Sequence, residues 1–281
     1  MANVHYASIG DVWKHLPLAE ILRIEHPLRY WETHSGSSSY PLTYSPERAY
    51  GAFAFLERAG RSPGLQGSAY WRLLARHGSA SALTYPGSPL IATELLGDVG
   101  GHFLFCDLDG ESLSNIADDS RALGVPLGSV GLVEGYGVSN LAAELSGLTE
   151  DKAAGTFLLV DPYRPLEPNS EGETPMGLFA RAAKRGVGGM LWYGFDSRRY
   201  RTALLEALCV GIEGSAWFGE VSLRAEDLSE VGFNPEMLGC GMVVCNVGQE
   251  TLAACGADAD AEEPYAQRAA CERKWHLGYS R

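Results

Sequence analysis

Short apolar runs alternate with longer amphipathic stretches through the middle of the sequence, and this alternation constrains the fold more than any other feature. The runs are HFLFCDLD (102–109), SVGLVEG (129–135), TFLLVDP (156–162) and GGMLWYG (188–194). Each is followed by a segment whose apolar residues recur with helical spacing. Unbroken apolar runs of this kind are typical of strands that are buried on both faces. Because parallel strands are joined by crossover helices, the pattern predicts an α/β fold with a largely parallel sheet.

Further strands are predicted on both sides of this region. Residues 28–34 (LRYWETH) precede it, and residues 215–224 and 239–246 follow it without a helical pattern between them. The last two therefore suggest an antiparallel hairpin at one edge of a mostly parallel seven-stranded sheet. Residues 46–83 hold two helical stretches around the loop RSPGLQG. We interpret them as a small helical insertion within a single domain that covers residues 1–281.

The charge of the chain bears on its partners. Acidic residues outnumber basic residues by 35 to 22, which gives a net charge of -13. Such a surface repels phosphate backbones on average, so binding to nucleic acid needs a local basic patch. The basic stretches near Lys184 and Arg198 are short and are typical of solvated helix faces. A nucleic-acid partner is therefore not expected.

The cysteines and the N-terminus bear on the compartment. The six cysteines show neither a CxxC pair nor the Cys/His spacing of a metal site, which favours a reducing environment and no metal. The N-terminal residues lack the basic and apolar regions of a signal peptide, and no apolar stretch is long enough to span a bilayer. We expect a soluble, cytoplasmic protein with no membrane partner.

Polar residues follow the predicted strands at the edge where open α/β sheets bind ligands. Gly36 provides a turn after the first strand, where a ligand can approach the backbone. Asp107 ends the next strand and is suited to accept hydrogen bonds from ribose hydroxyls. For Asp109, two residues later, the role of a helix N-cap is a sufficient explanation. Glu134 and Asp161 end the two strands after that. Together these residues predict a ligand cleft, although the full GxGxxG motif is absent.

Two earlier segments carry polar residues that could join this cleft. In HYASIGDVWKHLPLAEILRI, the histidines His5 and His15 and the lysine Lys14 surround a predicted helix start, for which Asp11 is a candidate N-cap. A solvated basic cluster is an equally good interpretation of these three residues. The rigid turn TYPGSP places Ser88 where its hydroxyl either caps the next helix or contacts a ligand.

Six motifs taken in chain order give the sequence a specific resemblance. They are HYASIGDVWKH, YWETHSG, TYPGSPLIA, FLLVDP, LWY and GCGMVVCN. In this order they resemble the RlmJ-type family of bacterial large-subunit ribosomal RNA adenine-N6 methyltransferases, and they span most of the chain. The resemblance implies a class I, Rossmann-like methyltransferase fold with a helical insertion after the first strand. It also implies the use of S-adenosylmethionine (SAM) as cofactor.

The resemblance assigns a cofactor site as well. The family's SAM contacts fall on His15, His34, Ser88, Asp107, Glu134 and Gly135, and Gly36 lies in the glycine turn beside them. Asp107 stands in place of a glutamate and Glu134 in place of an aspartate, so both positions keep a carboxylate. The catalytic aspartate of the family's Asp-Pro-Pro-Tyr motif falls on Asp161, which would also lie against SAM.

The departures from the family lie on the substrate side. In FLLVDPYRP, Tyr163 replaces the second proline of the motif and Arg164 replaces its tyrosine, and LWYG stands where the family has LWYP. In the family the motif holds a flat adenine against the tyrosine ring. A family tyrosine that contacts RNA near the N-terminus would precede Met1 in this chain. With the net charge of -13, these departures favour a small-molecule substrate over ribosomal RNA.

Two reactions on a small molecule suit such a site. In the first, the methyl group of SAM passes to a nitrogen or oxygen nucleophile, while Asp161 orients or deprotonates the nucleophile and Arg164 binds a substrate carboxylate. In the second, SAM cyclises and releases 5′-methylthioadenosine, which leaves azetidine-2-carboxylate or 1-aminocyclopropane-1-carboxylate. The candidate bases for that reaction are Asp161, Tyr163, His5 and Tyr6. Methyl transfer ranks first, cyclisation second and ribosomal RNA adenine methylation third, and a SAM-binding protein without activity is a fourth alternative. The sequence does not predict an oligomeric state.

Overall fold

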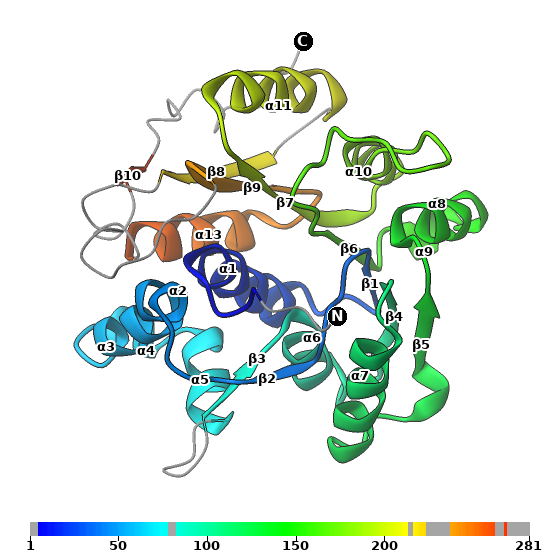
Figure 1. The fold of residues 1–281 in the computed structure, drawn as a ribbon. Coiled ribbons are helices and arrows are strands. Elements are labelled where there is room, and N and C mark those ends of the chain that lie inside the picture. Colours follow the sequence, from blue (N-terminus) through cyan, green and yellow to red (C-terminus); the bar gives the residue numbers. More distant parts are fainter. Residues whose placement is uncertain (1–4, 78–82, 213–215, 223–236, 262–266, 269–281) are drawn as a thin grey trace.

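The main sheet crosses the molecule from one edge to the other (Figure 1). The computed structural model describes residues 5–77, 83–212, 216–222, 237–261 and 267–268. The strand order is β10-β8-β9-β7-β6-β1-β4-β5. The strands are β1 (Arg29–Glu32), β4 (His102–Asp107), β5 (Val130–Glu134), β6 (Thr156–Val160), β7 (Gly188–Phe195), β8 (Ala216–Ser222), β9 (Gly239–Cys245) and the two-residue β10 (Gln267–Arg268).

The directions of the strands confirm the predicted fold class. β1 pairs in parallel with both β4 and β6, β4 with β5, and β6 with β7. β9 runs antiparallel to both of its neighbours, β7 and β8. The seven strands from β8 to β5 therefore form a mostly parallel sheet with an antiparallel edge, which is the class I SAM-dependent methyltransferase arrangement. The connection between β8 and β9 lies largely outside the described residues.

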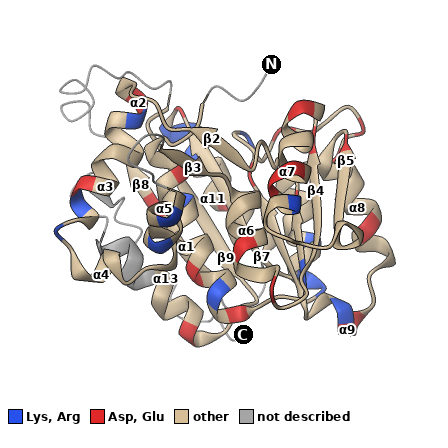
Figure 2. Cartoon of the chain, turned by 90° about the horizontal axis from the view of Figure 1, so that it is seen from below, with Lys and Arg blue, Asp and Glu red and all other residues tan. Residues whose placement is uncertain are grey.

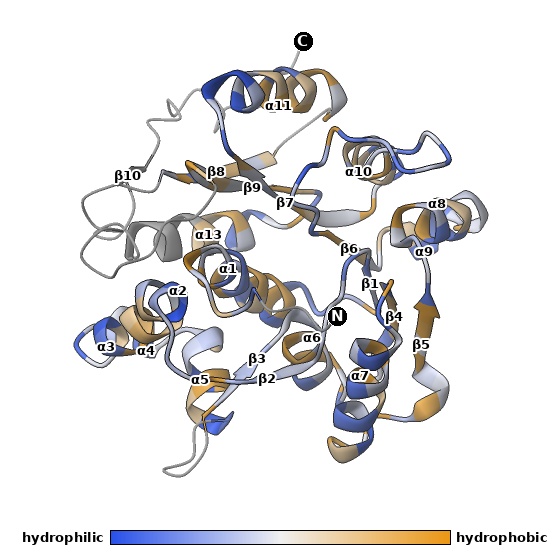
Figure 3. Cartoon of the chain, in the orientation of Figure 1, coloured by the Kyte–Doolittle hydropathy of each residue, from blue (hydrophilic) through white to orange (hydrophobic). Residues whose placement is uncertain are grey.

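Helices cover both faces of the sheet because side chains alternate along each buried strand. On one face Tyr30 packs against Phe105 and Phe157, and on the other Trp31 and Leu158 belong to a second apolar cluster. Figure 3 shows hydrophobic residues gathered on the strands and on the sides of the helices that face them. The helices over the first face are α1 (Ile9–Glu25), α6 (Ser88–Leu96), α7 (Gly110–Ala122) and α13 (Gln249–Ala261). Those over the second are α8 (Gly137–Gly147), α10 (Pro175–Lys184) and α11 (Arg198–Gly211).

Short helices fill the region of the predicted insertion. They are α2 (Pro46–Arg48), a π-helical turn (Ala49–Phe53), α3 (Ala54–Ala59), α4 (Pro63–Gln66) and α5 (Ala69–His77). The antiparallel pair β2 (Ser39–Pro41) and β3 (Thr84–Pro86) flanks this group. α1 contacts α5 and the π-helical turn on one side and α6 and β7 on another, so it lies between the insertion and the sheet. The short helical elements η2 (Leu127–Ser129) and α9 (Glu150–Ala153) precede β5 and β6.

The start of α1 is fixed by a reciprocal cap. Ser8 is the N-cap, and its hydroxyl accepts from the backbone N–H of Asp11, whose carboxylate accepts from the backbone N–H of Ser8. Asp11 is therefore the third helical residue, and the prediction that it is the N-cap is wrong. The helix continues through Pro17 to Glu25. Within the part of the chain that the structure describes, no helix has the length and apolar character needed to cross a membrane.

Candidate active site

A cavity of about 680 Å³ lies at the carboxyl ends of β1 and β6, beside the first turns of α1. The predicted site residues that line it are His5, Tyr6, His15, His34, Ser88, Asp161 and Tyr163. A second hollow of about 510 Å³ shares His34, Asp161 and Tyr163 with this cavity and continues to Gly36 and Asp107. The structure therefore brings most of the predicted residues together around two adjoining spaces.

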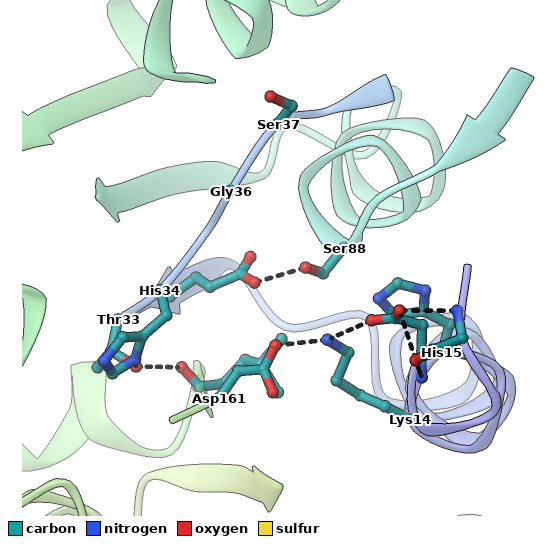
Figure 4. A network of polar contacts seen from close by, with 12 residues as sticks. Lys14, His15, Thr33, His34, Gly36, Ser37, Ser88 and Asp161 are labelled. Carbon is teal, nitrogen blue, oxygen red and sulfur yellow. Dashed lines mark hydrogen bonds and ion pairs between the residues drawn. The ribbon is translucent and has the colours of Figure 1, made fainter. Parts of the chain in front are cut away.

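Lys14 joins α1 to the end of β6. Its ammonium forms an ion pair with Asp161 and a second one, 3.3 Å long, with Asp11 (Figure 4). Burial raises the pKa of Asp161 to about 6, although the charge of Lys14 opposes this effect. Burial alone would lower the pKa of Lys14, but the carboxylates of Asp161 and Asp11 together raise it above its ordinary value. Lys14 is thus a permanent cation that holds the carboxylate of Asp161 in place.

Glu32 adds a second buried carboxyl behind this pair. It ends β1, is fully buried, and accepts hydrogen bonds from the Ser88 hydroxyl at 2.5 Å and the Tyr30 hydroxyl at 3.0 Å. Burial raises the pKa of Glu32 to about 8, the bond from Ser88 opposes this rise, and the charge of Asp161 adds to it. Asp161 therefore ionises first, and Glu32 remains largely protonated at neutral pH.

His15 lies one residue further along α1 and lines the same cavity. Its Nδ1 is 2.9 Å from the Tyr85 hydroxyl, which in turn accepts from the Tyr70 hydroxyl. Burial lowers the pKa of His15 well below its ordinary value, so the ring is neutral. Its Nε2 is buried and has no hydrogen-bond partner among the described residues. A buried nitrogen without a partner is costly, and a bound ligand would supply one.

The turn YPGSP places Ser88 by a close backbone contact. The N–H of Gly87 donates to the backbone oxygen of Ser38, and a Cβ at Gly87 would lie 2.3 Å from the backbone oxygen of Ser37. Only glycine fits this contact, which holds the first turn of α6 against the loop after β1. Ser88 is thereby fixed beside both Glu32 and the cavity.

The second hollow is organised by Asp107 at the end of β4. Its carboxylate accepts from the backbone N–H of Gly36 at 2.7 Å and from that of Asp109 at 2.9 Å. Gly36 has a φ of 59°, in the left-handed region that favours glycine. Asp109 is the N-cap of α7, as predicted. Gly135 donates its N–H to the backbone oxygen of Asp107, so the ends of β4 and β5 are held together.

Glu134 and Gly135 border this region without lining the main cavity. The side chain of Glu134 is exposed, and its carboxylate lies over Gly110, where an added Cβ would be 2.9 Å from Oε2. Gly135 lines a third hollow of about 400 Å³ next to His34 and Asp107. Glu134 lines none of these three hollows, and Gly135 lines only the third.

The predicted catalytic residues other than Asp161 occupy different positions. Tyr6 lines the cavity, stacks on Tyr40 with ring centroids 4.6 Å apart, and donates its hydroxyl to the backbone oxygen of Pro41. His5 is exposed at the mouth, with Nδ1 3.4 Å from the carboxylate of Glu47. The predictions that these residues act as bases stay predictions.

Tyr163 and Arg164 point to different surroundings. The ring of Tyr163 is 43% exposed, borders all three hollows and packs against Gly194. Of the three hollows formed by the described residues, Arg164 lines only the third. Its guanidinium forms ion pairs with Asp196 and Glu167. The guanidinium therefore already has two carboxylate partners.

Several residues of the site were not predicted. Lys14 appeared in the sequence only as part of a basic cluster, and Glu32 ended a predicted strand without being assigned a role. Glu47, which was assigned no role, also lines the cavity. No group of histidines, cysteines and carboxylates within the described ranges is arranged to hold a metal ion.

Comparisons with known proteins concern the fold. No family model matches the chain, and no curated protein matches it. The structure is similar to that of a Legionella pneumophila protein described as DUF519, with a TM-score of 0.72, 20% identity, and coverage of 93% of this chain and 94% of that one. At this identity the likeness is one of fold, and it extends over nearly the whole chain.

Other solved structures match less well. An O-methyltransferase from Bacillus cereus in complex with SAH has a TM-score of 0.44 and 9% identity, over 86% of this chain and 84% of that one. The O-methyltransferase TomG from Streptomyces achromogenes in complex with SAM has a TM-score of 0.42 and 11% identity, over 84% of this chain and 80% of that one.

Proposed function

We propose that this protein is a SAM-dependent methyltransferase that transfers a methyl group to a nitrogen or oxygen atom of a small molecule. The observation that carries the proposal is the position of Asp161. This carboxyl, whose side chain is 13% exposed, follows β6 at the edge where open α/β sheets bind ligands, and it borders both the cavity and the second hollow. A methyl donor in the hollow and an acceptor in the cavity would meet beside it.

The residues present fit SAM. Asp107 offers carboxylate oxygens at the end of β4, where ribose hydroxyls are commonly bound, and Glu134 and Gly135 would border the adenine. The partnerless Nε2 of His15 and the hydroxyl of Ser88 suit the polar methionine end, and His34 lies where the two spaces adjoin. When bound, SAM would supply a methyl group on a cationic sulfur.

Asp161 has the properties of a general base. A pKa of about 6 means that it is ionised at neutral pH while it still has useful affinity for a proton. Lys14 fixes the orientation of the carboxylate through the ion pair. When the acceptor gives its proton to Asp161, the charge of Lys14 is left balanced by Asp11, 3.3 Å away. The side chains of Lys14, Asp161 and Asp11 are 8%, 13% and 20% exposed, so little bulk water competes with the acceptor there.

We further propose that the chain is a divergent relative of the RlmJ-type methyltransferases with a changed substrate. The six motifs support the relationship, and the altered Asp-Pro-Tyr-Arg segment supports the change. The cavity lining adds to this, because carboxylates outnumber lysine and arginine side chains among its described residues. Figure 2 shows Lys and Arg interspersed with Asp and Glu along the helices in that view rather than gathered into one basic band. Such a surface does not favour RNA.

The test begins with the purified protein and SAM alone, followed by mass spectrometry, and continues with mixtures of small amines and alcohols. Methyl transfer predicts that SAM alone stays intact and that S-adenosylhomocysteine forms when an acceptor is added. Methylthioadenosine with an equal amount of a cyclic amino acid from SAM alone would replace methyl transfer by the cyclisation alternative. Transfer to ribosomal RNA in a parallel incubation would contradict the small-molecule proposal.

Asp161→Asn separates turnover from cofactor binding. We expect the variant to lose methyl transfer by at least about a hundredfold, because general base catalysis contributes about that much or more. SAM binding measured by calorimetry should survive, since the asparagine keeps the size of the side chain. Asp151→Asn, an exposed carboxylate of α9, is the matched control. Unchanged turnover in Asp161→Asn would remove this residue from the mechanism.

A further inference from the structure

The charge of the main cavity points to the acceptor. Three carboxylates line it, those of Asp11, Glu47 and Asp161, and within the described part of the chain Lys14 is the one lysine or arginine in the lining. Lys14 is already paired with both Asp11 and Asp161. Its single positive charge cannot neutralise both of these carboxylates, so it does not neutralise Glu47 as well. Arg48 also acts on Glu47, but its guanidinium lies over the Tyr6 ring, 4.1 Å from the centroid, and is not part of the lining. Among the described lining residues, negative charges therefore exceed positive ones.

Glu47 is the carboxylate with the weakest protein partner. It lies in α2 at the mouth, its side chain is 17% exposed, and its ion-pair partner in the described structure is His5 at 3.4 Å. The His5 side chain is 80% exposed, so the contact is open to solvent and easily replaced. Burial raises the pKa of Glu47 above its ordinary value, which shows that this carboxylate is held in a less favourable environment than water. A cation bound beside it would relieve that cost.

Aromatic rings line the same space. Tyr6 and Tyr40 form a stacked pair on the side of Glu47, and Trp192 and Tyr163 lie on the side of Asp161. The ammonium of Lys14 is 6.0 Å from the Trp192 ring, within the range in which ring faces attract cations. Carboxylates combined with aromatic walls are the composition that recognises organic ammonium groups.

His15 provides a further sign that ligands belong in this cavity, where its Nε2 would serve the methionine end of SAM. The residue is 3% exposed and lines the cavity, and its buried Nε2 has no partner among the described residues. Its ring is neutral because burial lowers its pKa, so it adds no positive charge that would repel a cation. Arg164, the residue predicted to bind a substrate carboxylate, lies outside this lining and is engaged by Asp196 and Glu167.

We propose that the methyl acceptor is a small organic amine that enters this cavity as its ammonium ion, with Glu47 attracting the cation at the mouth, Asp161 facing its nitrogen inside and the aromatic rings as walls. This inference rests on the proposed function. The ammonium gives one proton to Asp161, and the freed nitrogen lone pair forms a bond to the methyl carbon. The carbon–sulfur bond of SAM breaks with its electron pair going to sulfur. The products are the N-methylated ammonium ion, S-adenosylhomocysteine and protonated Asp161.

Three probes of one shape test the charge preference. Benzylamine, benzyl alcohol and phenylacetate share an aromatic ring and differ in charge, and their dissociation constants are measured by ligand-observed NMR at neutral pH. We expect benzylamine to bind about tenfold more tightly than benzyl alcohol, and phenylacetate more weakly than both. Equal binding of amine and alcohol, preference for phenylacetate, or no binding of benzylamine at millimolar concentration would each overturn the proposal.

Variants of Glu47 connect the preference to this residue. Glu47→Gln should weaken benzylamine binding about fivefold to tenfold and leave benzyl alcohol unchanged, and Glu47→Lys should weaken benzylamine further. Glu57→Gln, which removes an exposed carboxylate from α3 of the same insertion, is the matched control and should change neither probe. Thermal melts followed by circular dichroism establish that each variant is folded. Unchanged benzylamine binding in folded Glu47→Lys would contradict the assignment.

The failure of this inference can be told apart from failure of the proposed function. SAM binding by the wild-type protein is measured separately by calorimetry. Absence of SAM binding defeats the proposed function, whatever the probes do. Tight SAM binding with a cavity that prefers phenylacetate defeats only the amine proposal, and directs the search to acidic or neutral acceptors.

Discussion

Replacing Glu32 by glutamine should make the protein more stable at neutral pH, and most of the gain should appear as the pH rises. Glu32 is fully buried at the end of β1 and accepts hydrogen bonds from Ser88 and Tyr30. A glutamine has nearly the same shape, keeps one acceptor oxygen for the Ser88 hydroxyl, and can donate an N–H to the Tyr30 hydroxyl oxygen. The substitution therefore removes the ionisation of the side chain while its packing is kept.

The magnitude follows from the pKa of Glu32. Its ordinary value is 4.5, and burial raises it to about 8 in the folded protein. Between these two values the folded state holds one proton more than the unfolded state, so the free energy of unfolding falls as the pH rises. The interval is about 3.5 pH units, and each is worth about 1.36 kcal/mol. Ionisable Glu32 thus costs the wild-type protein up to about 5 kcal/mol above pH 8, and glutamine removes that cost.

The assay is urea denaturation of wild type and variant at several pH values between about 4.5 and about 8.5. We expect the difference in unfolding free energy to move in favour of Glu32→Gln by about 3–5 kcal/mol across this range. Glu57→Gln, whose side chain is exposed and paired with Arg61, should show no comparable trend. If the difference in unfolding free energy between Glu32→Gln and wild type stays constant within about 1 kcal/mol over this pH range, the reasoning is refuted. Glu32 would then ionise like a solvated carboxyl.

Two further predictions concern the ion pair and the packing of α8. Lys14→Met should raise the pKa of Asp161 and shift the acid limb of the rate–pH profile upward by about one to three pH units, because a charge at about 4 Å is worth about 4 kcal/mol at an effective dielectric constant of about 20. Lys152→Met, which removes an exposed lysine, is the control, and an acid limb that stays in the same place in both variants would contradict this prediction. Gly137→Ala should lower the thermal midpoint by the equivalent of about 1–3 kcal/mol or more, because its Cβ would lie 2.0 Å from a backbone oxygen of the loop after β1. Gly147→Ala at the other end of the same helix meets no atom within 4 Å and should be neutral or slightly stabilising, so equal melting temperatures for the two variants would count against the packing argument.

The parallel part of the sheet could be predicted because its signal is local. β6 is buried at all five positions, and the apolar run in the sequence coincides with it. The residues that follow a parallel strand reach the ligand edge whatever the details of packing, so Asp107 and Asp161 could be placed in a cleft from the sequence. The position of Ser88 could be predicted from the turn that precedes it. The glycine of this turn is required by a close backbone contact with the loop after β1.

The electrostatic centre of the site could not be predicted, because its members come together only through tertiary packing. Lys14 and Asp161 are 147 residues apart, and their ion pair depends on how α1 docks beside β6 and β7. Glu32 was visible as a carboxylate at the end of an apolar strand, but its raised pKa depends on burial that the sequence does not specify. Arg164 was expected to be available for a substrate, and the partner that engages it, Asp196, comes from the segment after β7.

The Asp-Pro-Tyr-Arg segment packs against the LWYG segment of β7. The ring of Tyr163 packs on the backbone of Gly194, where a Cβ would lie 2.7 Å from the ring carbon Cε2. Any larger residue at position 194 would place side-chain atoms in the space that the ring occupies. The ring of Tyr163 therefore depends on a glycine at position 194. In this position Tyr163 borders the cavity and both neighbouring hollows, so under the proposed function its ring would lie between the acceptor and the methyl donor.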